Sequence, residues 1–582
     1  MRSPKRWKNA SNGSLQPSRQ ARGGDCRPEK GRPAMAHKPR LGIQGPVVGW
    51  PDSWAAEASE EIMRTGTGSL VPSQDPRPEP KAFLKALSEL GADFYVHHVM
   101  PEAGEVPQLL VDAEEAGLDV CFGNEYGNIN GPWVEGTNRY DVTDTAVEQA
   151  VRSGRCIGLL YDEPEHLQIN AAQYRKDGWF PHWGSVDGLD LDSARRTVEE
   201  AVDARGRRVQ HLLEQAGKPD ASLPLISEHV FPVMFHTFAR AGMDVCPKIM
   251  KESFQSLQLA AALGAAKQYG RSLWICADLW GPDAGAWFTR YPGFPGHSPE
   301  EFESALKLGY LMGPSHLFVE NVDVLLRHSP QGFRQTEFGE VWEQFTRSFV
   351  PAHPLSWNHT RAEADIAVIH SDDANYGQNE RSFGSRTFVS GEAQQSVFHI
   401  WHLLSRGTIP SHGSCMHIPG YEFPRHELKR ATAPEAFPLE KGRVLGGRPV
   451  HGLFYPARSV LVFDEKVTAQ TLGQPGLILA GGSSLSPETF RALAARAEEG
   501  GVVVIARWLL PADCPGELTA SARRGAGRWI VTDHFLEERV REAVEPHLGE
   551  PGCWTQRFGT SEVRITAKNT EGTQLEFDIA GK

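Results

Sequence analysis

From Arg40 onward, short apolar runs of strand length alternate with longer segments whose apolar residues recur at helical spacing. This alternation is typical of repeated βα units around a parallel sheet. We expect strands at 41–44, 93–96, 119–122, 157–161, 223–227, 244–246, 273–277 and 316–319. Helices are expected around 81–90, 109–116, 145–153, 191–215, 235–241, 254–269 and 302–311. Eight such units in roughly 300 residues predict an α/β fold built on one (β/α)8 TIM barrel with insertions.

The pattern changes beyond residue 351. Apolar runs at 365–370, 460–463, 477–480 and 502–506 predict the strands of a second, doubly wound α/β sheet. Between the last two runs, Ser486 and Pro487 begin a helix as its N-cap and first-turn residue, and Gly500 ends it. The runs 563–567 and 574–579 alternate with period two, which indicates a small β segment.

These changes divide the chain into four predicted segments. Residues 1–38 form an N-terminal extension rich in Arg, Lys, Pro, Ser and Gly, and we expect it to be disordered or, with Met35 as the true start, residues 1–34 not to be translated. The barrel takes 39–350, the α/β domain 351–545 and the small β domain 546–582. Neither Gly-x-Gly-x-x-Gly nor Gly-Lys-Ser/Thr occurs in the sequence, so no nucleotide or other cofactor is expected.

Composition narrows the range of partners. The 582 residues carry 73 acidic and 60 basic side chains, a net charge of −13, so no nucleic-acid or anionic-membrane partner is expected. No apolar stretch approaches the roughly 18 residues that a membrane span needs. The eight cysteines form no Cys-x-x-Cys pair, which favours reduced thiols over disulfides or zinc. Because residues 1–36 lack the apolar core of a secretory signal, we expect a cytoplasmic protein.

The stretch Cys156 to His166 carries the clearest chemical signal. Its apolar run is followed at once by three carboxylates, Asp162, Glu163 and Glu165, with Pro164 among them. A continuous apolar run suits a strand buried on both faces, and proline cannot continue a strand ladder, so the acids fall where the strand ends. In a (β/α)8 barrel the carboxyl ends of the strands form the catalytic face.

Cleavage of a glycosidic bond needs two carboxyl groups that face each other. One donates a proton, and the other is a nucleophile at about 5–5.5 Å or a base at about 6.5–9.5 Å that activates water. Glu163 is the acid/base candidate, because the adjacent acids Asp162 and Glu165 would favour its protonated form. Asp278, after the seventh strand, is the nucleophile candidate, and Glu228 and Glu320 are alternatives for that role.

Other residues at strand ends and in loops are candidates for binding a substrate. The chain has 15 tryptophans, whose indole faces can stack on a sugar ring. The expected substrate-binding residues are His97, Asn124, Glu125, Asp162, Trp183, Glu228, His229, Trp280 and Glu320. Structural salt bridges or helix caps at loop starts are the alternative for each charged member of this set.

A metal is the minority interpretation. His97, His98, His229, Asp162 and Glu228 could gather one, but no recognisable metal spacing such as His-x-x-x-His occurs, so we expect no metal site. Adjacent residues of a strand point to opposite faces, so only one of His97 and His98 can reach the barrel mouth.

The motif Tyr161-Asp-Glu-Pro-Glu165 resembles the Asn-Glu-Pro signature of clan A glycoside hydrolases, in which the Glu is the acid/base. The order of barrel, α/β domain and small β domain is similar to that of the family 42 β-galactosidases. This resemblance implies a flavodoxin- or amidotransferase-like middle domain and a homo-oligomer, a dimer or trimer, built through it. Asp162 stands where clan A has Asn, and Asp278 stands where it has Glu, so the resemblance implies a distant branch.

The resulting hypothesis is a retaining glycoside hydrolase that acts on a terminal sugar or a short oligosaccharide. Two alternatives stay open. One is a lyase or a metal-dependent sugar isomerase on the same barrel. The other is a non-catalytic carbohydrate-binding or scaffold protein, because the clan A residues are imperfectly kept.

Overall fold

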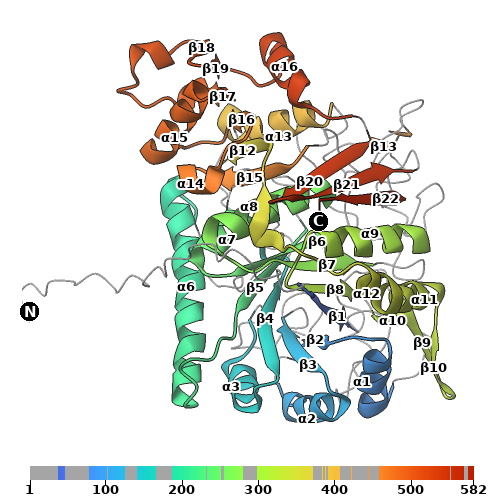
Figure 1. Ribbon diagram of the computed structural model, residues 1–582. Helices are drawn as coiled ribbons and strands as arrows, with labels where there is room; N and C mark the ends of the chain where they lie inside the picture. Colours follow the sequence, from blue (N-terminus) through green and yellow to red (C-terminus); the bar gives the residue numbers. More distant parts are fainter. Residues whose placement is uncertain are drawn as a thin grey trace, which may run out of the picture. The chain divides into compact units, whose positions relative to one another are not determined.

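The computed structural model of the chain is drawn in Figure 1. It describes residues 37–45, 78–100, 103–124, 141–165, 186–230, 232–250, 255–279, 298–320, 322–370, 383, 387, 391–406, 421–422, 443–444, 458–550, 552–568 and 574–581. None of the helices in these ranges is both long enough and apolar enough to cross a bilayer.

Parallel strands close into a barrel in the order in which they follow one another along the chain. They are β1 (Arg40–Gln44), β2 (Phe94–His98), β3 (Asp119–Gly123), β4 (Cys156–Asp162), β5 (Leu225–His229), β6 (Asp244–Ile249), β7 (Trp274–Asp278) and β8 (His316–Glu320). Pairing of β1 with β8 completes the ring. The predicted (β/α)8 barrel is thus confirmed, and each of its strands lies where an apolar run predicted it.

Most of the strands run further toward their carboxyl ends than their apolar residues indicated. The clearest case is β6, which continues to Ile249 although the apolar run ends at Cys246. Its last residues, Lys248 and Ile249, pair with Cys276 and Ala277 of β7, so a neighbouring strand extends the ladder past Pro247. The polar residues expected just after the strands therefore lie within them, and strand alternation decides which face each one takes.

The barrel interior is filled by side chains from alternate strand positions. These are Phe94, Val96, Cys121, Leu160, Ile226, Cys246, Trp274, Cys276 and Phe318. Phe94 and Trp274 meet edge to face, with ring centroids 5.7 Å apart. This layer forms a dry floor beneath the carboxyl ends of the strands, where the candidate site lies.

Helices surround the barrel. They are α1 (Pro80–Glu89), α2 (Val106–Ala116), α3 (Asp144–Ser153), α6 (Leu191–Gln215), α7 (Phe235–Ala241), α8 (Gln255–Tyr269) and α9 (Pro299–Leu311). Thr143, Asp190 and Ser298 cap α3, α6 and α9 by accepting a backbone N–H of the first turn. After β8 come α10 (Val322–Leu325), the hairpin β9 (Leu326–Ser329) and β10 (Gly332–Gln335), α11 (Glu337–Gln344), a π-helical turn (Phe345–Phe349) and α12 (Val350–Ala352).

A second, mostly parallel sheet has the order β15-β12-β16-β17-β19-β18. Its strands are β12 (Ile366–His370), β15 (Val460–Asp464), β16 (Leu477–Ala480), β17 (Val502–Ala506), β18 (Ala522–Arg524) and β19 (Gly527–Thr532). The helices are α13 (Glu392–Leu404), α14 (Ala469–Leu472), α15 (Pro487–Glu498) and α16 (Glu538–Val544). The order of the first five strands in space is that of flavodoxin-like folds, as predicted. Ser486 caps α15, since its Oγ accepts from Thr489 N–H at 3.0 Å.

An antiparallel sheet joins β11 (Ala362–Glu363), β20 (Cys553–Phe558), β21 (Ser561–Ala567) and β22 (Leu575–Ala580). The period-two alternation of the last residues therefore did indicate strands. The short β11 comes from the range 351–545, so this sheet is not made by residues 546–582 alone, and the segment boundaries remain predictions. A separate two-stranded pair consists of β13 (Tyr421–Glu422) and β14 (Arg443–Val444).

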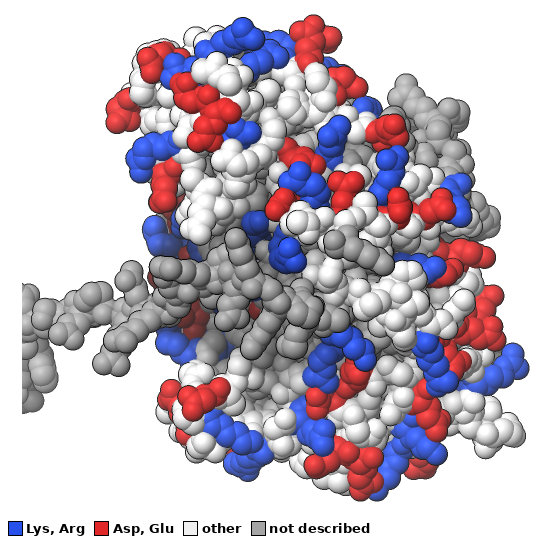
Figure 2. Space-filling model, in the orientation of Figure 1, with Lys and Arg blue, Asp and Glu red and all other residues white. Residues whose placement is uncertain are grey.

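Basic and acidic side chains are interspersed over the described part of the face drawn in Figure 2. No broad field of positive charge gathers there, in keeping with the net charge of −13.

Helix α8 packs closely against β15 of the second sheet. Gly264 of α8 has no side chain, and a Cβ at this position would overlap the backbone carbonyl of Val462. Beside it, His236 Nε2 donates to the same Val462 oxygen at 3.0 Å, and Arg240 binds Asp464 at 2.8 Å. The glycine therefore sets how closely the helix and the strand approach.

We predict that Gly264→Ala lowers the free energy of unfolding by about 1–3 kcal/mol, because a backbone carbonyl cannot yield as a flexible side chain can. Gly206→Ala in α6 is the matched control. A Cβ there meets nothing within 4 Å, so helix propensity alone should raise stability by up to about 1 kcal/mol. Urea denaturation of both variants checks this, and equal effects at the two glycines would contradict it.

Candidate active site at the barrel mouth

Strand alternation brings the strand-end acids into the barrel mouth. Asp162 continues the inward-facing series of β4 that includes Leu160, and Glu228 continues that of β5. Asp278 and Glu320 occupy the same position on β7 and β8 and are paired in register, as are Asp162 and Glu228. All four side chains are almost fully buried.

Lys248 of β6 lies among these acids. Its Nζ is 2.8 Å from Asp162 Oδ1, 2.9 Å from Glu320 Oε2 and 3.3 Å from Glu163 Oε1. The lysine lies two residues after Cys246, which lines the interior, so the alternation of β6 directs Lys248 inward. The sequence places Lys248 near the end of this strand, but it was not chosen as a site residue because the apolar run ends at Cys246. Continuing the alternation by one pair would have found it.

The electrostatics keep Lys248 charged. Burial alone would lower the pKa of its ammonium, but Asp162, Glu228, Glu320 and Asp278 together raise that pKa well above its ordinary value. A lysine that forms a Schiff base with a carbonyl substrate needs the opposite shift, because only the neutral amine attacks. The direction of the shift thus favours the charged ammonium, which donates hydrogen bonds, over the neutral amine.

Glu163 has an uncommon backbone conformation. Its φ of 45° lies in the left-handed region, which costs a non-glycine residue about 1–3 kcal/mol. Its N–H donates to the Glu228 carbonyl oxygen at 2.8 Å, and Glu165 Oε1 two residues later accepts from Val230 N–H at 2.7 Å. These two bonds tie the end of β4 to the end of β5. They hold the turn in which the Glu163 carboxylate reaches Lys248.

The shared lysine limits the separation of two carboxylates. Glu163 Oε1 and Glu320 Oε2 lie 3.3 and 2.9 Å from the same Nζ, so the distance between them cannot exceed the sum of these values. This limit applies to the two oxygens nearest the lysine and is compatible with the ~5–5.5 Å between carboxyl groups that is typical of retaining glycosidases. Glu163 and Glu320 can therefore both face one anomeric carbon.

The surroundings of Glu228 shift its pKa. Burial, and then the charges of Asp162 and Glu320, raise its pKa well above the ordinary value, although Lys248 opposes this. Glu228, Cys276 and Glu320 place potential ligand atoms within 4.8 Å of one another. The Lys248 ammonium, however, lies 2.9 Å from Glu320 and already provides the positive charge that a metal ion would bring.

The predicted binding residues differ in placement. Asn124 adjoins the cluster, where its Oδ1 accepts from Asp162 N–H at 2.9 Å. His97 lies on the outer face of the barrel wall, 3.3 Å from both Tyr95 OH and Glu105 Oε1. His229 also faces outward, stacked on Phe235 with ring centroids 4.1 Å apart. Both histidines were expected to bind substrate, but in the structure their side chains point away from the barrel mouth.

His98, which sequence reasoning named but did not choose, takes the inward position on β2. Gly123 of β3 leaves room for its ring, since a Cβ there would collide with His98 Nδ1. Burial, followed by the charges of His97 and Lys248, lowers the pKa of His98 well below its ordinary value. The neutral ring can both donate and accept a hydrogen bond. Glu125, Trp183 and Trp280 lie outside the described residues.

Comparison with solved structures relates this architecture to known enzymes. A β-galactosidase from Bacillus circulans sp. alkalophilus superposes with a TM-score of 0.51 at 9% sequence identity, over 91% of this chain and 93% of that chain. A β-galactosidase from the psychrophilic Marinomonas ef1 gives 0.48 at 9% identity, over 90% and 95% of the two chains. An exo-β-1,4-mannosidase from Opitutaceae bacterium strain TAV5 gives 0.41 at 12% identity, over 94% and 87%.

The likeness to the Bacillus circulans protein extends over nearly the whole of both chains, and it shows a shared fold. The predicted β-galactosidase-like architecture is therefore confirmed as a fold. No protein-family model matches the sequence, and comparison with curated proteins gives no match either.

We predict that Lys248→Met lowers the free energy of unfolding by about 3–5 kcal/mol near neutral pH, because it leaves buried carboxylates without their counter-ion. Without the ammonium, the acids must hold protons in the folded state. The folded protein then binds more protons than the unfolded chain, so stability falls as pH rises above the ordinary carboxyl pKa of about 4.3. Glu228, whose pKa is already raised, responds in this direction.

Urea denaturation at about pH 5 and about pH 8 measures the difference. The loss caused by Lys248→Met should be larger at the higher pH. Lys85→Met is the control, since Lys85 is exposed and pairs only with exposed Glu89 among the described ion pairs. A Lys248→Met protein as stable as its parent at both pH values would contradict the role given to the ammonium.

Proposed function

We propose that this chain is a glycoside hydrolase that cleaves a terminal sugar or a short oligosaccharide with retention of configuration. Glu163 is the acid/base, and Glu320 is the nucleophile favoured among the candidates. The observation that carries the proposal is the pair of contacts from Lys248 Nζ to Glu163 and Glu320, which brings one oxygen of each carboxylate to the same ammonium and supports a closely spaced, retaining pair. The fold shared with a β-galactosidase supports the enzyme class but not the sugar.

The reaction takes two steps. Protonated Glu163 gives its proton to the glycosidic oxygen while Glu320 attacks the anomeric carbon, which breaks the glycosidic bond and forms a glycosyl ester on Glu320. The ionised Glu163 then takes a proton from water, whose oxygen attacks the same carbon and releases the carboxylate of Glu320. Two inversions restore the starting configuration.

The Asp162–Lys248 pair accounts for a departure from the clan A motif. An Asn at position 162 would bring an amide donor toward the sugar 2-hydroxyl, and a carboxylate cannot supply one. Lys248 Nζ lies 2.8 Å from Asp162, 2.9 Å from Glu320 and 3.3 Å from Glu163, so its three N–H bonds serve these acids and the one toward Glu163, at the longest contact, would turn to a sugar hydroxyl. We assign the hydroxyl-donor role to Lys248, with Asp162 orienting it and Asn124 holding the Asp162 backbone.

Other members of the cluster have supporting roles in this scheme. Glu228, with its raised pKa, can donate to a sugar hydroxyl as a neutral acid. Asp278 is the alternative nucleophile, since it is paired in register with Glu320. The metal-dependent isomerase alternative gains nothing from this geometry, because Lys248 provides positive charge beside Glu320, and the lyase alternative stays open. A homo-oligomer and a cytoplasmic location stay predictions from the sequence.

We predict that Glu163→Gln lowers turnover of a competent substrate about 10²–10⁴-fold, because general acid–base catalysis typically contributes that much. A panel of nitrophenyl glycosides first identifies the sugar that is hydrolysed. The loss should then be smaller for nitrophenyl glycosides than for alkyl glycosides of the same sugar, since nitrophenolate leaves without a proton. Glu115→Gln, at an exposed acid of α2, is the control.

Glu320→Gln and Asp278→Asn separate the two nucleophile candidates. The nucleophile variant should lose activity toward both leaving groups equally, and the product anomer followed by NMR should show retention in the parent protein. Near-normal turnover by Glu163→Gln would remove Glu163 from the scheme. An inverted product, or sugar binding without turnover across the panel, would contradict the proposed reaction.

A further inference from the structure

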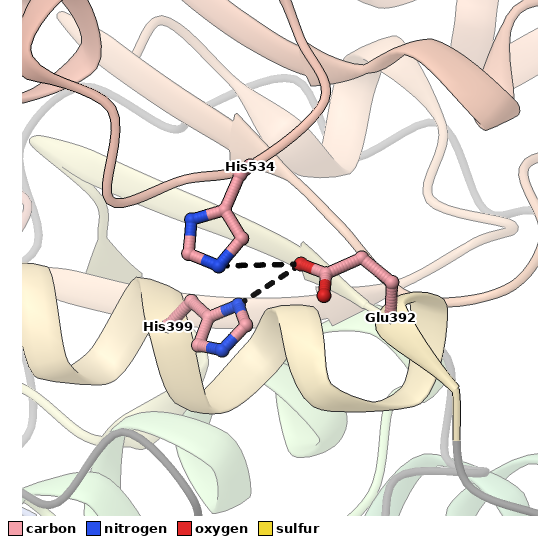
Figure 3. Close-up of side chains that lie close together, drawn as sticks. All are labelled: Glu392, His399 and His534. Carbon is pink, nitrogen blue, oxygen red and sulfur yellow. Dashed lines mark ion pairs between the residues drawn. The ribbon is translucent and has the colours of Figure 1, made fainter.

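Three side chains of the α/β domain converge at a place remote in sequence from the barrel residues. Glu392 and His399 come from α13, and His534 follows β19 (Figure 3). His399 Nδ1 lies 3.1 Å from Glu392 Oε1, and His534 Nε2 lies 3.7 Å from the same oxygen. The two imidazole rings face each other with centroids 4.3 Å apart. Neither the predicted site nor the proposed function uses these residues.

The spacing of the ligand atoms matches a metal site. Zinc binds imidazole nitrogen and carboxylate oxygen at about 2.0–2.2 Å in tetrahedral geometry, which separates two ligand atoms by roughly 3.3–3.5 Å. The observed separations of 3.1 and 3.7 Å fall on either side of that value. All three potential ligand atoms lie within 4.8 Å of one another, so a small shift would bring them around one ion.

The local structure holds each ligand in place. Glu392 and His399 are seven residues apart, two helical turns, so they share one face of α13. The helix start is fixed by Gly391 N–H, which donates to Gln394 Oε1 at 2.9 Å. His534 is held by Thr532, whose Oγ1 accepts from His534 N–H at 3.2 Å and donates to its carbonyl at 2.9 Å.

We propose that Glu392, His399 and His534 bind a divalent transition-metal ion of the zinc type, with water completing the coordination. Two imidazole nitrogens and one carboxylate oxygen favour Zn²⁺, Co²⁺ or Ni²⁺ over Mg²⁺ and Ca²⁺, which prefer oxygen ligands. The bound ion would fasten the start of α13 to the segment between β19 and α16. This site is independent of the barrel acids, so it stands or fails separately from the glycosidase proposal.

One contact limits the affinity. Leu536 N–H donates to His534 Nδ1 at 3.1 Å, which leaves the ring proton on Nε2 in the metal-free protein. Coordination through Nε2 moves that proton to Nδ1 and ends this hydrogen bond. We therefore expect binding in the micromolar range instead of the tighter range of structural zinc sites, and stronger binding at higher pH, since the ligands must be deprotonated.

The test uses the full chain without an affinity tag, freed of metal by EDTA and dialysis. Titration calorimetry with ZnCl₂ should give one site, and MgCl₂ should give none. His399→Ala and His534→Ala should each weaken Zn²⁺ binding at least tenfold, and Glu392→Gln should weaken it as well. His211→Ala, at an exposed histidine of α6, is the matched control and should bind as the parent does.

Co²⁺ distinguishes this site from adventitious binding at a cysteine. Nitrogen and oxygen ligands give visible d–d absorption without the near-ultraviolet charge-transfer band of a cobalt–thiolate bond. Circular dichroism verifies that each variant is folded. If either alanine variant is unfolded, Glu392→Gln, which keeps the side-chain volume, replaces it in the binding test. Absence of Zn²⁺ binding, a thiolate band, or unchanged affinity in both histidine variants would overturn the proposal and leave a hydrogen-bonded trio.

Discussion

The barrel mouth depends on one buried ammonium group. Lys248 lies within 3.3 Å of oxygens from Asp162, Glu163 and Glu320, three acids supplied by two different strands of the ring and the turn after one of them. Removing such charges from water is costly, and only close pairing offsets that cost. Glu228 and Asp278 add to the same crowding of acids. Two effects limit the negative charge there: the ammonium of Lys248 pairs with the acids, and the pKa of Glu228 is raised.

The sequence was sufficient for the scaffold because the scaffold depends on local patterns. Apolar runs and helical spacing located the barrel strands, and the run 477–480 coincides with β16. The limits of α15 were also predictable, because they depend on the local preferences of an N-cap serine, a first-turn proline and a terminating glycine, which are Ser486, Pro487 and Gly500. The apolar part of a buried strand can be recognised in the sequence regardless of which strands become its neighbours.

Where each strand ends is a different matter, because it depends on neighbours that are distant in the chain. The last residues of β6 are strand only because β7 pairs with them, and that pairing directs Lys248 inward. The choice between His97 and His98 likewise follows from the alternation of β2 and from the space left by Gly123. The left-handed turn at Glu163 is stabilised by the hydrogen bond from its N–H to the Glu228 carbonyl oxygen. The sequence pattern of one segment cannot predict this bond, because its acceptor lies on another strand.

The two departures from the clan A pattern gain a common explanation from Lys248. With Asn at position 162, a lysine at this place would have one carboxylate fewer to offset its burial. With Asp, the pair is mutually compensating, since the ammonium lies 2.8 Å from the carboxylate of residue 162. The shorter Asp278 is then no obstacle to a two-carboxylate reaction, because Glu320 contacts the same ammonium as Glu163. The acids of the β4 motif are thus joined in space by a residue of β6, a strand that the motif does not include.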